Sequence, residues 1–210
     1  RTAKVLVRKN AEISAQDEAL RAANARLTAQ ANDLFRAATT DPLTALTNRG
    51  HVMQQMIELF DRHKAQGARL SLLLIDLDRF KPINDSMGHQ FGDRVLIAAA
   101  RVLREEMRDG DPLGRYGGEE FIAALPGASS DEALVTAERL RLAMQRRMGM
   151  LEGQAIDLTA SIGLAELHET GAGSLSALIA AADDALYRAK DLGRNRTEIA
   201  RSGSDRRKPT

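Results

Sequence analysis

Nine consecutive residues, Leu70–Asp78, are aliphatic almost throughout and end in two aspartates. A run of this length between polar residues is typical of a strand covered on both faces, because a surface helix would show regularly spaced polar positions. Such a strand needs packing partners on both sides of its sheet. Asp76 is predicted to lie where the strand leaves the core, and a buried carboxylate there requires a cation or hydrogen-bond donors.

A second acidic pair, Glu119 and Glu120, follows the dipeptide Gly117-Gly118 and precedes the apolar run 121–125. Two glycines between a short strand signal and an apolar run predict a tight hairpin, because both central positions of the favoured turn need positive φ. Taken alone, the two acids would be solvated groups beside a turn, which is a common arrangement.

The two acidic segments become informative together. If the hairpin pairs beside the strand 70–78, Asp76 and Glu119 converge. Oxygen ligands of this kind, together with a substrate phosphate, are what Mg²⁺ prefers. Carboxylates placed in this way can bridge two metal ions for an in-line phosphoryl displacement.

The first forty residues contain an apolar residue at every seventh position and neither Gly nor Pro. The stripe consists of Leu6, Ile13, Leu20, Leu27 and Leu34, and the positions three residues before each are Ala3, Asn10, Asp17, Asn24 and Ala31. A sustained heptad predicts a coiled coil over residues 1–40, although the small and polar second positions make its seam weak. The alternative is a single amphipathic helix lying on the domain. Pro42 is expected to end this helix at Asp41.

The composition excludes several classes of function. The 210 residues include 30 basic and 29 acidic side chains, and a net charge of +1 gives no bulk field to recruit nucleic acid. The lack of cysteine excludes disulfides and thiol chemistry and suits the cytoplasm, where we expect the protein. No apolar stretch approaches the roughly 20 residues that span a bilayer, and no signal peptide is recognisable. Because the first residue is Arg1, we expect a fragment whose upstream part has been removed.

After residue 41 the pattern alternates between helix and strand. Helices are predicted over about 50–66, 91–107, 131–148 and 174–192, and strands over 70–78, 156–165 and 197–200 beside the hairpin 112–125. This order predicts an α+β fold with a mainly antiparallel sheet and helices packed on its faces. The last segment, 201–210, is expected to be a disordered basic tail.

Several motifs in order resemble those of the GGDEF family, the diguanylate cyclases, over residues 41–200. They are Asp41-Pro42-Leu43-Thr44 with Asn48-Arg49, Asp76-Leu77-Asp78-Arg79-Phe80-Lys81, Asn84-Asp85 with Gly88-His89 and Gly92-Asp93, the hairpin turn Arg115-Tyr116-Gly117-Gly118-Glu119-Glu120-Phe121, and the segment 187–195. Glu119 replaces the aspartate that names the family, giving the GGEEF variant, and Ala45 stands where the family often has Gly. The resemblance implies a palm-like, ferredoxin-type core shared with nucleotide cyclases and polymerases.

The resemblance further implies a metal site for two Mg²⁺ ions per GTP, or Mn²⁺ in their place. Its ligands would be the side chains of Asp76, Glu119 and Glu120 and the backbone carbonyl of Leu77. Glu119 and Glu120 are the expected catalytic residues, and Glu119 would assist deprotonation of the attacking 3′-hydroxyl. Asp78 shares a strand face with Asp76, and we expect it to be a structural hydrogen-bond acceptor.

By the same resemblance, Lys81, Lys190 and Arg194 hold the triphosphate, and Asn84 and Asp93 select the base. Single charges of this kind are usually solvated, but Lys190 and Arg194 are four residues apart near a helix end and are expected to share a face. A carboxylate accepts from N1 and N2 of guanine, whereas adenine presents an acceptor at N1, so GTP is preferred over ATP. The plain alternatives are a turn at Asn84 and a helix cap at Asp93.

Arg108 and Asp111 form an Arg-x-x-Asp pair whose distance from Gly117 matches the inhibitory product site of the family. Arginine can clamp phosphate and stack on guanine, while the carboxylate accepts from a guanine edge. Arg139, on the following predicted helix, is expected to contribute as a second arginine. Without the family register, a salt bridge within the loop would be the preferred interpretation.

The resemblance therefore implies a diguanylate cyclase that condenses two GTP into cyclic di-GMP and two pyrophosphates, with product inhibition. One domain offers one GTP site, so two chains must meet as a homodimer, which the coiled coil would assemble under an upstream sensory domain. No nucleic-acid partner and no membrane segment are expected. The alternatives are a catalytically silent module that binds GTP or cyclic di-GMP and a structural dimerisation module.

Overall fold

The computed structural model describes residues 2–200, with the side chains of residues 16–18 and 20–200. The chain divides into two compact units, Arg1–Thr39 and Thr40–Thr210. The predicted basic tail 201–210 lies outside the described residues. Within the described part, no helix is both long and apolar enough to cross a membrane.

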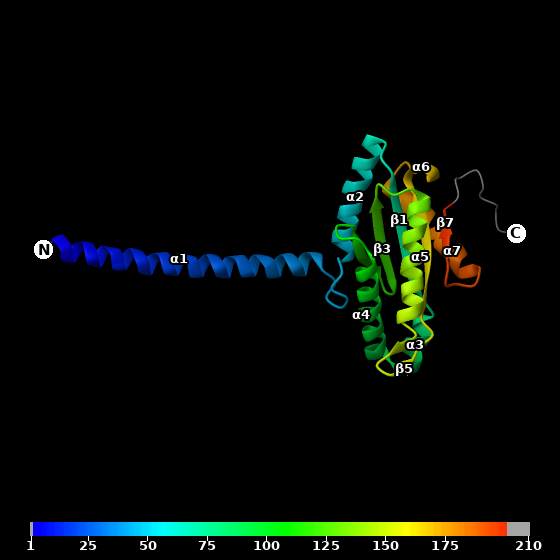
Figure 1. The fold of residues 1–210 in the computed structure, drawn as a ribbon, viewed down its shortest axis with the longest axis horizontal. Helices are drawn as coiled ribbons and strands as arrows, with labels where there is room; N and C mark the ends of the chain where they lie inside the picture. The colour runs from blue at the N-terminus through cyan, green and yellow to red at the C-terminus, as the bar shows by residue number, and fades with distance from the viewer. Residues whose placement is uncertain (1, 201–210) are drawn as a thin grey trace. The chain divides into compact units, whose positions relative to one another are not determined.

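The first unit is one continuous helix, α1 (Thr2–Thr39), as the lack of Gly and Pro predicts (Figure 1). Leu20, Leu27 and Leu34 of the heptad stripe are 60%, 63% and 71% exposed in the single chain. The side chains of the other stripe members, Leu6 and Ile13, lie outside the described part. Large apolar side chains in a regular row are thus left uncovered by the chain itself.

The second unit is built on a five-stranded sheet with the order β2-β3-β1-β6-β7. The strands are β1 (Leu70–Asp78), β2 (Leu113–Gly117), β3 (Glu120–Pro126), β6 (Thr159–Glu166) and β7 (Thr197–Ile199). The central strand β1 runs antiparallel to both β3 and β6, and β2 runs antiparallel to β3, while β7 pairs in parallel with β6. The predicted α+β fold with a mainly antiparallel sheet is confirmed.

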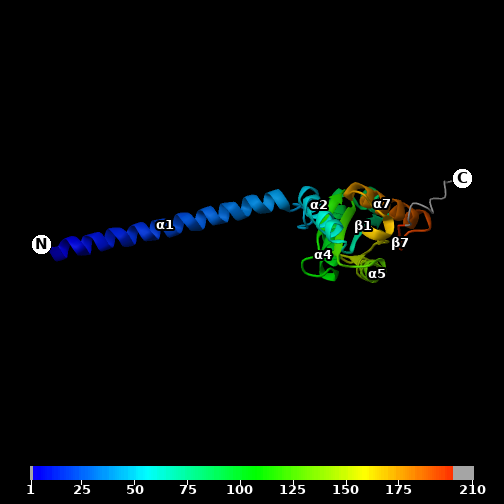
Figure 2. The same ribbon diagram turned by 90° about the horizontal axis from the view of Figure 1, so that it is seen from above.

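Helices cover both faces of this sheet (Figure 2). One layer holds α2 (Arg49–Gln66) and α7 (Leu175–Asp191), and the other holds α3 (Phe80–Met87), α4 (His89–Glu106) and α5 (Ser130–Arg147). Alternate residues of β1 serve the two layers: Leu72 and Leu74 join the first, and Leu73 and Ile75 the second. All nine residues of β1 are buried, which confirms the strand covered on both faces.

Local signals set the ends of the longer helices. The Asn48 side chain accepts from the His51 N–H at the start of α2, and α2 ends at Gly67 in the left-handed conformation. Ser129 and Glu132 form a capping box at the start of α5. The observed ends of the four predicted helices lie within two residues of the predicted ends; these helices are α2, α4, α5 and α7.

Short elements are where the predicted pattern is incomplete. The helices α3 and α6 (Leu167–Thr170) and the two-residue strands β4 (Met150–Leu151) and β5 (Gln154–Ala155) were not expected. The predicted strand 156–165 begins later, at Thr159, and ends at Glu166. In α3, Pro82 lies in the first turn, where no intrahelical N–H is needed, so residues that resemble a loop still form a helix.

Candidate active site

Two neighbouring strands bring the predicted metal carboxylates together. Asp76 on β1 is the direct antiparallel partner of Glu120 on β3. The backbone N–H of Leu77 donates to the carbonyl of Glu119 over 3.3 Å. The predicted pairing of the hairpin with the central strand is confirmed, and this pairing is what makes the acidic segments converge.

The hairpin turn differs from the predicted one at its centre. Gly117 ends β2, and the two turn residues are Gly118, with a φ of +47°, and Glu119. The register shifts between Arg115 and Gly117, which moves the turn one residue along the chain. The expectation that both glycines occupy the central positions is therefore wrong, and the shift places a carboxylate in the turn itself.

Asp76 is the most buried carboxylate of this group. It is 7% exposed, and its Oδ2 lies 2.8 Å from Nζ of Lys190 on α7. Burial raises the pKa of Asp76 to about 6; Lys190 opposes this rise, and the charges of Glu119 and Glu120 add to it. The position therefore requires a cation, and in this structure the ammonium group of Lys190 supplies it.

The chemistry of the residues fits a hard divalent cation, although the side chains are not gathered around one point. Among residues 16–18 and 20–200, no three or more His, Asp or Glu side chains form a group that could hold a metal ion as they stand. At Asp76, the carboxylate pairs with Lys190 instead. Carboxylates and a backbone carbonyl are nevertheless the kinds of ligand that Mg²⁺ prefers.

The expected base-recognition residues lie on two consecutive helices, Asn84 on α3 and Asp93 on α4. A Cβ atom at Gly92 would lie 1.7 Å from Oδ1 of Asn84, so only glycine lets this amide rest against the backbone of α4. The Oδ1 atom is buried, and no described residue donates a hydrogen bond to it. Asp93, one residue further, is exposed. The Asn84 amide is therefore packed against Gly92, the chain neighbour of Asp93.

The three expected phosphate ligands come from different places in the fold. Lys81 is exposed in the first turn of α3, and Lys190 lies in the last turn of α7. Arg194 lies beyond α7, which ends at Asp191, in a turn where its φ is +67° and its N–H donates to the Ala189 carbonyl over 2.9 Å. The expectation that Lys190 and Arg194 share a helix face is therefore wrong, because a left-handed turn places Arg194.

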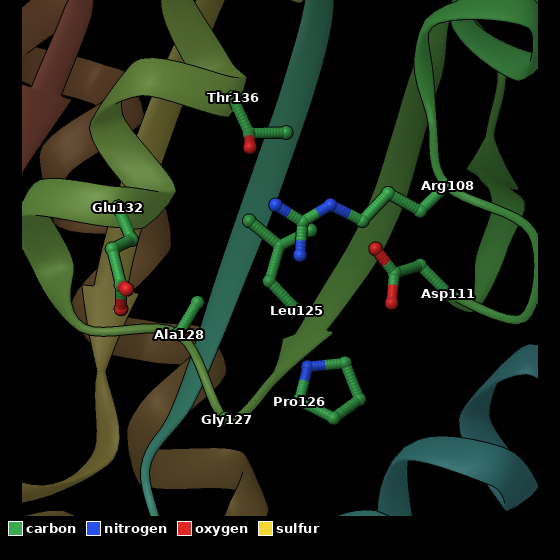
Figure 3. A pocket seen from close by; sticks show the side chains of 8 residues that line it. All are labelled: Arg108, Asp111, Leu125, Pro126, Gly127, Ala128, Glu132 and Thr136. Carbon is green, nitrogen blue, oxygen red and sulfur yellow. The ribbon is translucent and has the colours of Figure 1, made fainter.

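Arg108 and Asp111, the expected product-site pair, line one pocket (Figure 3). Both lie in the loop between α4 and β2, and Figure 3 shows Arg108 reaching across Leu125 toward α5. Burial raises the pKa of Asp111, and the charge of Arg108 opposes this shift. The other side of the pocket carries Glu132 and Thr136 of α5, polar groups that the sequence did not single out.

Arg139 does not line this pocket in the present arrangement. Its Nη2 donates to the Glu106 carbonyl over 2.8 Å, and its Nε lies 3.6 Å from the Glu106 carboxylate. Arg139 therefore fastens α5 to the end of α4, beside the loop that carries Arg108. A role toward a ligand would require this side chain to leave Glu106.

The protein family of this chain follows from its similarity to known sequences. A family model described as "Diguanylate cyclase, GGDEF domain" matches residues 38–196. The chain is a member of the GGDEF family. The protein "Diguanylate cyclase DgcP" from Pseudomonas aeruginosa is 39% identical over 168 residues, which are 80% of this chain and 25% of that protein. The chain spans between a quarter and about half of the length of curated relatives such as this one.

Solved GGDEF structures have the same fold. The coiled coil and GGDEF domain of DgcB from Caulobacter crescentus, in complex with c-di-GMP, align with a TM-score of 0.79 and 31% identity, covering 90% of this chain and 99% of that one. The active GGEEF domain of a diguanylate cyclase from Vibrio cholerae aligns with a TM-score of 0.69 and 34% identity, covering 75% and 99%. The second of these proteins is described with the same GGEEF signature as this chain.

One contact in this GGDEF domain joins two family motifs that the sequence analysis treated separately. Nη1 of Arg115 in the hairpin lies 3.3 Å from Oδ1 of Asp41, and Nη2 of Arg115 donates to the Gly118 carbonyl over 2.8 Å. Burial alone would raise the pKa of Asp41, but hydrogen bonds from Thr44 and the charge of Arg115 lower it. The opposite charges of Asp41 and Arg115 were the signal that could have suggested this pair.

Proposed function

We propose that this protein is a diguanylate cyclase that condenses two GTP into cyclic di-GMP and two pyrophosphates. The convergence of Asp76 with Glu119 and Glu120 beside the cation Lys190 is the observation that carries the proposal, in a chain of the GGDEF family. In each half-reaction a 3′-hydroxyl oxygen bonds to the α-phosphorus of the opposite GTP. The bond between that phosphorus and the pyrophosphate oxygen breaks, and the hydroxyl proton is lost.

Asp76, Glu119, Glu120 and the Leu77 carbonyl would hold two Mg²⁺ ions, or Mn²⁺ in their place. When bound, the ions would lower the pKa of the attacking hydroxyl and neutralise charge on the phosphates. Glu119, in the turn between β2 and β3, would accept the hydroxyl proton. Asp76 is paired with the cation Lys190 in the free protein, and a bound ion would take the place of that cation.

Asn84 and Asp93 would recognise the guanine base. The carboxylate of Asp93 accepts from N1 and N2 of guanine, whereas ATP would leave it facing the N1 acceptor of adenine. The Asn84 amide packs against Gly92, next to Asp93 in the chain, and has a buried oxygen to which no described residue donates. A site built around hydrogen-bonding groups rejects a base that leaves them unpaired, so GTP is the expected substrate.

Lys81, Lys190 and Arg194 would bind the triphosphate. Positive charge around the phosphates stabilises the loose transition state and the leaving pyrophosphate. Lys190 would have two partners in turn, Asp76 in the free protein and phosphate oxygens in the complex. In the free protein the charges of Asp76 and Lys190 neutralise each other. In the complex the metal ions would neutralise Asp76 and the phosphates would neutralise Lys190.

Two chains would form the active enzyme, because one GTP site supplies one of the two nucleotides in the product. The exposed row Leu20, Leu27 and Leu34 of α1 would form a coiled coil with the same row of a second chain. The structural neighbour DgcB was solved with a coiled coil beside its GGDEF domain, which supports this assignment. An upstream sensory domain would act by shifting the register of this helix pair.

The pocket at Arg108 and Asp111 would bind cyclic di-GMP as an inhibitor, with Arg139 as a further arginine. Arg108 offers a bidentate phosphate clamp, and Asp111 an acceptor for a guanine edge. Inhibition would follow if the bound product favours an arrangement of two domains in which their GTP sites do not face each other.

Incubation with Mg²⁺-GTP, with the products separated by chromatography, tests the proposed reaction. We expect cyclic di-GMP from the unmodified chain and none from Glu119→Gln, which keeps the size of the side chain and removes its charge. A silent binding module would instead show a thermal shift with GTP or cyclic di-GMP and no product, because a ligand of the folded state raises its stability. A structural module would show neither.

A further inference from the structure

Asp78, two residues beyond Asp76 on β1, is a buried carboxylate whose two oxygens both accept hydrogen bonds. It is 2% exposed. Its Oδ1 accepts from Ser161 Oγ over 2.7 Å, and its Oδ2 accepts from Thr159 Oγ1 over 2.7 Å and from the backbone N–H of Asn195 over 3.0 Å. The expected role as a structural acceptor is confirmed. The new element is the partner from residue 195, which lies far along the chain.

That partner belongs to a turn with an unusual backbone. Gly193, Arg194 and Asn195 have φ values of +113°, +67° and +46°. Residues with a Cβ rarely adopt the left-handed region, so two of them in succession must be held by their surroundings. The hydrogen bond from Asn195 to Asp78 is one such support, and it ties the turn to the central strand.

A second support comes from α5. Nη1 of Arg141 donates to Oδ1 of Asn195 over 2.8 Å. Arg141 is itself fixed by three hydrogen bonds to the carboxylate of Glu138, which also accepts from Thr197 Oγ1 over 2.6 Å. The Arg141 side chain is 14% exposed and that of Glu138 is 37% exposed, so the guanidinium is the better shielded partner of this ion pair. The turn is therefore clamped between β1 on one side and α5 on the other.

We propose that Asp78 and Arg141 are positioning residues for triphosphate binding, acting through the turn 193–195. Arg194 is exposed in this turn, and Asp76 lies on the same face of β1 as Asp78. By fixing the Asn195 backbone and side chain, the clamp holds Arg194 at a constant place relative to the metal carboxylates. The inference rests on the proposed function, because it requires Arg194 to contact the phosphates.

The contacts distinguish this role from metal ligation. Asp76 faces a cation, Lys190, whereas Asp78 faces two hydroxyl groups and a backbone amide. An asparagine can keep these contacts, since its amide oxygen accepts from Thr159 and Asn195 while its NH₂ donates to Ser161. A metal ligand would lose its charge in the same replacement. Asp78→Asn should therefore be mild for a positioning residue and severe for a ligand.

The test is calorimetric binding of 3′-deoxy-GTP, which lacks the attacking hydroxyl, and of GMP, to the full chain in Mg²⁺. We expect Asp78→Ala to lower the affinity for 3′-deoxy-GTP about tenfold, which corresponds to roughly one charge-assisted hydrogen bond at Arg194. The affinity for GMP should change less than about twofold. Asp78→Asn should recover most of the affinity. Asp157→Asn, which removes an exposed acid paired with Arg79, is the matched control and should bind both nucleotides normally.

Arg141→Gln is the second variant, because it leaves Asp78 and its donors intact where Asp78→Ala could prevent folding. Arg141→Gln should likewise lower the affinity for 3′-deoxy-GTP and leave the affinity for GMP unchanged, with a smaller loss than in Asp78→Ala. Equal losses for both nucleotides, an unchanged affinity in Arg141→Gln, or an Asp78→Asn variant as weak as Asp78→Ala would overturn the inference. A wild-type chain that binds neither nucleotide would overturn the proposed function as well, so the two failures are separable.

Discussion

The carboxyl group of Asp76 is the group in the site whose pKa is raised by its surroundings. It is buried, paired with Lys190 and repelled by Glu119 and Glu120, and its pKa is raised to about 6. A raised pKa means that the folded state binds the proton more tightly than the unfolded state. The stabilising contribution is complete below the unfolded pKa near 4 and is lost as pH rises through about 6.

Asp76→Asn should remove this pH dependence in metal-free protein. Between pH 4 and pH 7.5, we expect the free energy of unfolding of the variant to rise relative to the wild type by about 2 kcal/mol, since each pKa unit corresponds to about 1.4 kcal/mol. Denaturant titrations across this pH range measure the difference, with Asp157→Asn as an exposed control. Parallel curves for wild type and Asp76→Asn would contradict the raised pKa.

Ala45 illustrates strain in a single residue. Its φ is +58°, the left-handed region, at a position where the GGDEF resemblance indicated glycine. The left-handed conformation costs an alanine about 1–2 kcal/mol, and glycine avoids this cost. Glycine also has more freedom in the unfolded chain, which offsets part of the gain. We expect Ala45→Gly to raise the free energy of unfolding by about 0.5–1 kcal/mol.

Thermal unfolding of Ala45→Gly should show this gain as a melting temperature a few degrees higher. Ala128→Gly is the control, because Ala128 is not among the residues with positive φ, and it should be destabilised. A lower melting temperature for both variants would show that the turn at residue 45 carries no strain.

At the scale of elements, the proposed base recognition depends on the close approach of α3 and α4. A Cβ at Gly92 would lie 1.7 Å from Oδ1 and 2.8 Å from Cγ of Asn84, so the amide must move if Gly92 gains a side chain. The backbone of α4 itself tolerates alanine, which favours helix.

Gly92→Ala should therefore displace Asn84 and raise the KM for GTP about tenfold, the equivalent of one hydrogen bond to the base. Steady-state kinetics measure this effect, and Gly149→Ala, with no heavy atom within 4 Å of its Cβ position, serves as control. If KM stays at the wild-type value, Asn84 is not a base-recognition residue.

The elements also show what sequence patterns reveal and what they leave out. The strand β1 and the hairpin were predictable because aliphatic runs and a Gly-Gly dipeptide are local signals. The helix α3 was not, because Pro82, Asn84 and Asp85 resemble a loop and packing against α4 decides their conformation. The position of Arg194 depends on a left-handed turn held by Asp78 and Arg141, contacts between distant segments that no local pattern encodes.

At the scale of the whole molecule, the proposed reaction requires two chains. Each chain would contribute one GTP site, and the row Leu20, Leu27 and Leu34 would hold the pair together. The row is exposed in the single chain, so its burial between two chains is the expected source of association energy. Activity should then depend on the concentration of the protein.

Replacing both Leu20 and Leu27 by Asp should lower the specific activity at low protein concentration, with recovery as the concentration rises. Ala22→Asp with Ala29→Asp is the matched control, because these exposed positions have the same spacing on another face of α1. Sedimentation and initial rates on the same samples separate assembly from chemistry. Unchanged specific activity in the leucine variant would contradict the role of the stalk.

The proposed reaction joins two GTP molecules through their α-phosphates, and phosphorus NMR during turnover with Mg²⁺ follows this step directly. We expect the GTP signals to be replaced by a phosphodiester signal of cyclic di-GMP and by pyrophosphate, two pyrophosphates for each cyclic dinucleotide. Formation of GDP and inorganic phosphate, or a spectrum in which GTP persists, would contradict it.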